Sequence, residues 1–181
     1  MGPYSRKALT RGPRRGRGVG GTRDDAYLPT KKVAGPVVCP VCRAVCQRGR
    51  WSWTPVPDAA AEHECPACRR TRDGMPAGRI RLEGEFGARR AEILSLVLHR
   101  EAAEKADHPL ERIMTISEEP WGLSITTTGV HVARRIAEAL RKAWHERIEI
   151  RYAKSQDLVR VTWKHESEPA AARRPLSGGR S

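Results

Sequence analysis

The chain has 181 residues and a formal net charge of +13, from 34 Lys and Arg against 21 Asp and Glu. This length fits one domain of ordinary size or a core with small attachments. We expect no membrane span, because no stretch approaches about 18 consecutive apolar residues. The basic balance favours a polyanionic partner such as nucleic acid.

Residues 1–36 are predicted to be a disordered basic arm rich in Arg and Gly. Residues 1–32 carry nine Lys or Arg against two Asp and have almost no apolar side chains to bury. Such a segment either orders on a phosphate backbone, as arginine-rich segments do on RNA, or serves as a solubilising tail; we favour the first. No apolar stretch typical of a secretory signal follows the basic start, so a cytoplasmic location is expected. The candidate phosphate contacts here are Arg14, Arg15 and Arg17.

Two Cys-x-x-Cys pairs are the strongest motif, Cys39 with Cys42 and Cys65 with Cys68. Two pairs at this separation predict a zinc ribbon. Each pair can grip a metal from one tight turn, and four thiolates complete a closed tetrahedral site that leaves no position for substrate. We expect the ribbon to cover residues 37–72, with Zn²⁺ supplying much of its folding free energy.

Other roles for these cysteines fit less well. An odd number of cysteines and no secretory signal argue against a disulfide framework, whereas iron–sulfur ligation and redox chemistry stay open as alternatives. Cys46 is expected to be a buried, inert thiol, and replacement of one cysteine ligand by His63 is a minor alternative. Trp51 and Trp53 lie between the pairs. They either dock onto neighbouring structure, which we favour, or stack on unpaired bases.

A strand and a helix are predicted after the ribbon. Residues 78–86 alternate between apolar and charged side chains, which indicates a half-buried strand. Residues 88–106 are strong helix formers and stop just before Pro109. The apolar segment 93–98 covers more than one helix face, so we expect it to be buried or to contact a protein partner or a second copy of the chain.

Two hairpins are predicted around a second helix. Residues 112–117 are expected to pair with 123–128, and 148–153 with 158–164, because most of these segments alternate with a period of two. Their solvent faces would present hydroxyl and basic groups. The candidate nucleic-acid contacts on these strands are Arg151, Arg160 and Lys164.

The helix expected over 129–145 is strongly amphipathic, with Thr128 as its predicted N-cap. Its polar face carries several cations but only one carboxylate, Glu138, at a spacing that allows pairing. A shortage of acids on a basic face favours phosphate contacts. The candidate contacts on this face are Arg134, Arg135, Arg141 and Lys142.

Several runs carry a resemblance to a known family: the Cys-Pro-x-Cys knuckles, His108-Pro-Leu-Glu-Arg-Ile113, Ile125-Thr-Thr-Thr-Gly-Val-His-Val-Ala-Arg-Arg-Ile136 and Leu158-Val-Arg-Val-Thr-Trp163. Across residues 35–165 the chain resembles a family of uncharacterised bacterial zinc-ribbon proteins. That family is distantly similar to the nuclear export adaptor of the large ribosomal subunit. The resemblance implies that the four paired cysteines bind the metal and that the partner is a ribosomal surface or RNA. Arg43 and Arg69 follow the knuckles where ribbons often place glycine.

The sequence therefore predicts an α+β protein. A zinc ribbon is followed over residues 78–165 by an antiparallel sheet with two helices on one face, and residues 166–181 form a disordered tail. The phosphate loop, the dinucleotide fingerprint after a strand and the nucleophile elbow are all missing, so we do not expect an enzyme. We predict a non-enzymatic zinc protein that binds structured RNA or a ribosomal surface. The alternative is a zinc-scaffolded protein–protein adaptor.

Overall fold

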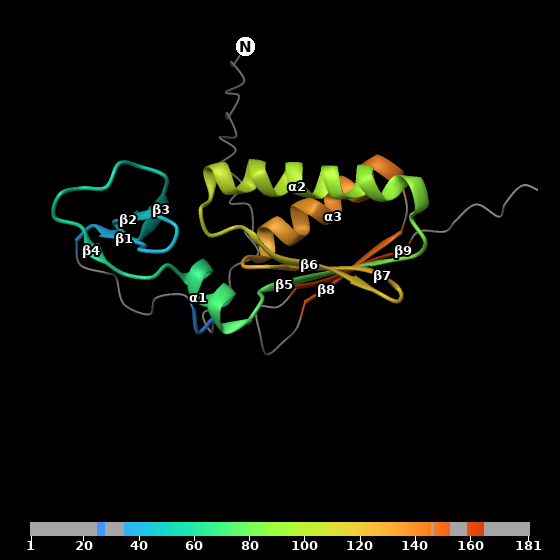
Figure 1. Cartoon of the computed structure of the whole chain (residues 1–181), viewed down its shortest axis with the longest axis horizontal. Coiled ribbons are helices and arrows are strands. Elements are labelled where there is room, and N and C mark those ends of the chain that lie inside the picture. The colour runs from blue at the N-terminus through green and yellow to red at the C-terminus, as the bar shows by residue number, and fades with distance from the viewer. Residues whose placement is uncertain (1–24, 28–34, 146, 153–158, 165–181) are drawn as a thin grey trace, which may run out of the picture.

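The computed structural model describes residues 25–27, 35–145, 147–152 and 159–164. They form two modules that lie side by side (Figure 1). We call residues 35–74 the ribbon module and residues 77–164 the α+β module. The predicted contacts Arg14, Arg15 and Arg17 and the tail 166–181 lie outside the described residues.

The ribbon module is a small sheet followed by a short helix. Its strands are β1 (Val37–Val38), β2 (Val45–Gln47), β3 (Arg50–Ser52) and β4 (Ala61–Glu62), in the order β3-β2-β1-β4. The helix α1 (Pro66–Asp73) was not predicted, although the sequence carries both of its end signals. Pro66 occupies the first helical turn, and Gly74 ends the helix in the left-handed conformation with φ 63°.

The α+β module confirms the predicted fold class. Its elements are β5 (Gly78–Glu83), the 3₁₀ turn η1 (Gly87–Arg89), α2 (Arg90–Asp107), β6 (Ile113–Glu119), β7 (Gly122–Thr127), α3 (Val130–Trp144), β8 (Ile148–Tyr152) and β9 (Val159–Lys164). The sheet order is β6-β7-β5-β9-β8. Both predicted hairpins form, as β6 with β7 and β8 with β9.

One strand pair departs from the predicted antiparallel sheet. β5 pairs with β9 in parallel, whereas the β5–β7, β6–β7 and β8–β9 pairs are antiparallel. The chain leaves β5 through α2 and returns as β6, and β7 inserts between the two strands, as in a split βαβ unit. The last hairpin then places its second strand, β9, beside β5. The sheet is therefore mixed.

Helices α2 and α3 cover one face of this sheet and enclose its core (Figure 1). Alternating strand residues such as Ile80, Leu82 and Val161 point inward against α3. Trp163 is almost fully buried, and its ring stacks on Phe86 with centroids 5.6 Å apart. No helix in the described part of the chain is long and apolar enough to cross a membrane.

The apolar segment 93–98 is used mostly inside the chain. Ile93 and Val97 are fully buried, and Leu94 and Leu96 pack against the same core. Leu98 remains 52% exposed. Intrachain packing thus explains most of this segment, and the expected contact with a partner or a second copy stays a prediction.

Candidate metal centre and basic surfaces

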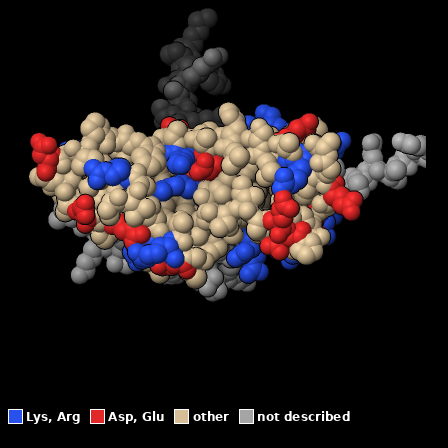
Figure 2. All heavy atoms as spheres, in the orientation of Figure 1, with Lys and Arg blue, Asp and Glu red and all other residues tan. Residues whose placement is uncertain are grey.

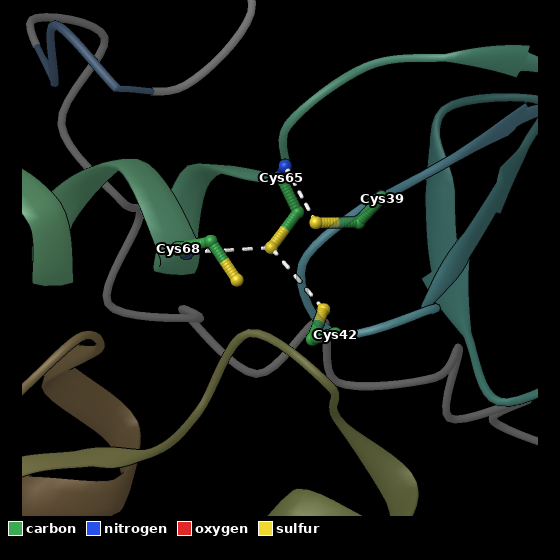
Figure 3. Close-up of side chains that lie close together, drawn as sticks. All are labelled: Cys39, Cys42, Cys65 and Cys68. Carbon is green, nitrogen blue, oxygen red and sulfur yellow. Dashed lines mark hydrogen bonds between the residues drawn. The ribbon is translucent and has the colours of Figure 1, made fainter.

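The structure brings the four predicted ligands together. The Sγ atoms of Cys39, Cys42, Cys65 and Cys68 all lie within 4.8 Å of one another (Figure 3). The first pair stands on the turn between β1 and β2, and the second pair stands at the start of α1. The Cys42 and Cys65 sulfurs are 3.7 Å apart, close to the edge of about 3.8 Å in a tetrahedron with Zn–S bonds of about 2.3 Å. The donor set therefore fits a tetrahedral metal site, and closed sites of four thiolates are typical of structural zinc.

Backbone N–H groups support the two knuckles. The Sγ of Cys39 accepts a hydrogen bond from the Cys65 backbone N–H, and the Sγ of Cys65 accepts one from the Cys68 N–H, both at 3.4 Å. Arg43 takes the left-handed conformation, with φ 66°, at the position where ribbons often have glycine. The second knuckle runs directly into α1, so Arg69 is helical there and needs no such conformation.

The thiols differ in how readily they ionise. Burial raises the pKa of Cys65 far above its usual range, and it raises the pKa of Cys68 to about 11 although Arg112 opposes the rise. Burial also disfavours the Cys39 thiolate, but backbone N–H groups outweigh it and lower the pKa of Cys39 to about 7. A bound cation would favour ionisation of all these thiols, because metal ligands bind as thiolates.

Arg112 contacts this centre from the α+β module, and the sequence analysis missed it. Its Nη2 donates to the Sγ of Cys42 at 3.2 Å and to the Sγ of Cys65 at 3.3 Å, and its Nη1 lies 3.6 Å from the Sγ of Cys68. Four thiolates around Zn²⁺ leave two net negative charges, and one guanidinium offsets half of them. A donor that contacts the ligand sulfurs in this way orients them and tunes the metal. The only sequence signal was the place of Arg112 in the run 108–113.

Thr128 fixes the backbone of Arg112 to the start of α3. The Arg112 N–H donates to the Thr128 Oγ1 at 2.9 Å, and the Thr128 N–H donates to the Arg112 carbonyl at 2.9 Å. The predicted N-cap role of Thr128 is therefore wrong, because its hydroxyl donates to the Leu110 carbonyl at 2.6 Å. The cap comes instead from Glu111, whose Oε2 accepts the Val132 N–H at 2.9 Å.

The remaining ribbon residues follow the interpretations that we favoured. Cys46 is buried on β2 and is not one of the four clustered sulfurs. His63 is exposed and also lies outside that group. Trp51 is 9% exposed in the ribbon core, and the Trp53 Nε1 donates to the Lys105 carbonyl at the end of α2, at 2.6 Å. Trp51 thus belongs to the core of the ribbon module, and Trp53 docks on the α+β module. With Arg112, Trp53 ties the ribbon module to the α+β module.

Residues 25–27, within the predicted arm, contact the ribbon module. Asp25 forms an ion pair with Arg70 of α1 at 2.5 Å, with both side chains largely buried. The Tyr27 hydroxyl donates to Asp73 at 3.0 Å, and the Arg70 guanidinium lies 4.5 Å from the centroid of the Tyr27 ring. These contacts place residues 25–27 of the predicted arm against α1.

The predicted nucleic-acid contacts do not form one surface. Those on α3 face away from the sheet, whereas those on β8 and β9 project from the opposite face of the sheet. Glu104 of α2 pairs with Arg135 at 3.2 Å, and Glu138 pairs with Arg134 at 2.9 Å, so acids neutralise part of the helix face. Arg141 and Lys142 are exposed and form no ion pair within the described residues. Figure 2 shows basic and acidic groups interleaved over the face that it displays.

The open face of the sheet carries a row of cations that sequence reasoning had only partly identified. The strand register aligns Arg79 of β5 with Arg160 of β9, and Arg160 with Arg151 of β8. Thr126 of β7 continues this row on the other side of Arg79. Arg79 was missed as a candidate because its place beside Arg160 depends on the parallel β5–β9 pairing. We call Thr126, Arg79, Arg160 and Arg151 the sheet-face row.

Comparisons of the chain with protein-family models, with curated proteins and with solved structures give no match. The family resemblance drawn from the sequence therefore stays a prediction.

Proposed function

We propose that the protein is a zinc-stabilised, non-enzymatic RNA-binding protein that uses the open face of its sheet to contact RNA. The observation that carries this proposal is the sheet-face row. Its three arginines lie on neighbouring strands, which are about 4.8 Å apart, and the row itself contains no acid. Cations held side by side at this spacing favour a phosphate backbone over an isolated acidic side chain.

Local contacts leave most of this row available. Arg79 and Arg160 are exposed and form no ion pair within the described residues, whereas Arg151 pairs with Glu149 at 3.0 Å in solvent. An exposed pair of this kind contributes little stability, so a phosphate can displace it at small cost. Beside the row, the Arg81 guanidinium lies 3.9 Å from the centroid of the Trp121 ring and pairs with Glu83 at 2.5 Å, so we do not count Arg81 among the available cations.

The remaining predicted contacts have supporting roles in this proposal. The row lies on the opposite side of the sheet from Arg141 and Lys142, so a folded RNA would have to reach around an edge to touch both. We assign the first contact to the sheet face. Lys164 is a weaker candidate because its ammonium lies 3.5 Å from Glu83. We also assign phosphate contacts of low sequence specificity to the basic residues of the arm.

The test is the salt dependence of RNA affinity in matched double variants of the full chain. We expect Arg79→Ala with Arg160→Ala to weaken binding of a labelled single-stranded RNA and to reduce the slope of log K against log salt by about 1.4, since each single-strand phosphate contact contributes about 0.7. Arg48→Ala with Arg100→Ala removes the same charge from exposed positions elsewhere and should retain the slope. An unchanged slope in the sheet-face variant would remove the basis of the proposal.

A further inference from the structure

A cavity of about 460 Å³ lies between the two modules, and neither the four cysteines nor the residues of the sheet-face row line it. The ribbon module contributes Arg50 and Trp51 to its lining, and the end of α2 and the following loop contribute Glu104, His108 and Glu111. Arg135 and His131, in the first turns of α3, also line it, as do Pro109 and Leu110. The volume falls within the range of about 300–1,000 Å³ typical of small-molecule sites.

The residues that line the cavity differ in burial according to their chemical type. Trp51 is buried and the carboxylates Glu104 and Glu111 are half-buried, whereas the cations Arg50 and Arg135 are exposed. The interior therefore offers an aromatic ring and hydrogen-bond acceptors. The rim offers two guanidinium groups, of which Arg135 is paired with Glu104 and Arg50 forms no ion pair within the described residues. A ligand that matches both parts needs a flat ring with N–H donors at one end and an anionic group at the other.

The two carboxylates have acceptor capacity to spare. Glu111 receives the Val132 N–H on Oε2, and within the described residues its Oε1 has no donor. Glu104 receives Arg135 on Oε1, and its Oε2 likewise has no donor there. Burial raises the pKa of Glu111, as expected for a carboxylate with few donors around it. Half-buried acceptors without a donor favour a ligand that brings donors.

We propose that this cavity binds a guanine nucleotide, with the base against Trp51 and the two carboxylates and the phosphate at the basic rim. Guanine suits the interior because its N1–H and its 2-amino group point the same way along one edge and can both donate to carboxylate oxygens. Adenine has a single amino donor on its corresponding edge and an acceptor beside it. Stacking on an aromatic ring and hydrogen bonds to the Watson–Crick edge are how proteins recognise unstacked bases. The proposal does not depend on the RNA-binding face.

The test is calorimetric titration of the zinc-loaded full chain with GMP, AMP, guanosine and inorganic phosphate, with no RNA present. We expect GMP to bind at least about tenfold more tightly than AMP, because guanine makes one more hydrogen bond to the carboxylates and adenine turns an acceptor toward them, and more tightly than guanosine or phosphate. Equal affinity for GMP and AMP, or no binding of GMP, would overturn the proposal. Neither result would bear on the RNA-binding face, which is measured separately.

Two variants distinguish the ends of the cavity. Glu111→Gln retains an oxygen that can cap α3 but replaces one carboxylate acceptor by an amide donor. This variant should therefore reduce the preference for GMP over AMP. If Glu111→Gln does not fold, Glu104→Gln makes the same test. Arg50→Ala should weaken GMP but leave guanosine unchanged, and Arg100→Ala outside the cavity should bind GMP as the unaltered chain does. Wild-type affinities in both cavity variants would contradict the assignment.

A short RNA with one unpaired guanine that competes with GMP would identify RNA as the source of the nucleotide, and failure to compete would identify a free nucleotide.

Discussion

Arg112 and Cys42 join the two modules at the metal centre: the Arg112 Nη2 donates to the Cys42 Sγ at 3.2 Å across a sequence separation of 70 residues. The same nitrogen contacts Cys65, and the backbone of Arg112 is held by Thr128. The four-sulfur group therefore has its charge partner in the other module. Metal occupancy and docking of the ribbon module should depend on each other.

Replacing Arg112 should weaken metal binding. Arg112→Ala removes three N–H···S contacts and the one guanidinium that contacts the sulfurs within the described residues, so we expect zinc affinity to fall by about 10–100-fold. Arg112→Lys retains the positive charge but lacks the forked pair of N–H donors, so its zinc affinity should lie between those of the unaltered chain and Arg112→Ala. Competition with a chromophoric chelator measures the affinity. Arg100→Ala is the control, and equal affinity in Arg112→Ala would show that the contact has no effect on the metal.

Zinc binding should release protons, and its apparent affinity should rise with pH. Burial holds the pKa of Cys68 at about 11 and that of Cys65 higher still in the metal-free chain, so both thiols are protonated at neutral pH. They must lose those protons to bind the metal, so the metal-free form binds more protons and lower pH favours it. Calorimetry in two buffers of different ionisation enthalpy counts the protons. A heat that is independent of the buffer would contradict this expectation.

Metal removal should unfold the ribbon module and leave the α+β module folded. The ribbon core consists largely of Trp51, Cys46 and the ligand cysteines themselves, whereas the α+β core is a separate and larger cluster. Without zinc the ribbon loses most of its folding free energy. Amide exchange with and without a chelator should show loss of protection over residues 37–73 and continued protection in β5, β7 and α3. Loss of protection in both modules at once would show that they fold as one unit.

Gly78→Ala should destabilise the α+β module. A Cβ at Gly78 would collide with the Thr127 hydroxyl and would lie 2.7 Å from the Cβ of Ala133, where β5 and α3 approach each other closely. We expect a loss of about 1–3 kcal/mol in the free energy of unfolding, as for other overpacked cores. Ser95→Ala, at an exposed position on α2, should change it by less than about 0.5 kcal/mol. Thermal and denaturant unfolding measure both, and equal stability would show that this contact relaxes without cost.

Patterns local in sequence predicted much of the fold and the metal ligands. The Cys-x-x-Cys spacing identified all four sulfurs, and period-two alternation identified both hairpins, because these features depend on neighbours along the chain. The helix α1 was missed although Pro66 and Gly74 mark its ends, since the predicted ribbon left no place for a helix.

Features that depend on distant residues could not be predicted. The parallel pairing of β5 with β9 is not encoded in either strand, and without it Arg79 and Arg160 have no reason to be neighbours. In the same way threonine is a residue type that often caps helices, and Thr128 directly precedes α3. The capping hydrogen bond nevertheless comes from Glu111, which lies in another segment. The contact of Arg112 with the sulfurs also arises only when the two modules dock.

The central claim is that four cysteines from two knuckles hold one zinc ion. X-ray absorption at the zinc edge, with elemental analysis of the full chain purified without added metal, tests it most directly. We predict one zinc per chain with four sulfur neighbours at about 2.3 Å. A metal-free chain whose ribbon module is folded, or a zinc bound by nitrogen or oxygen ligands in place of sulfur, would contradict the account.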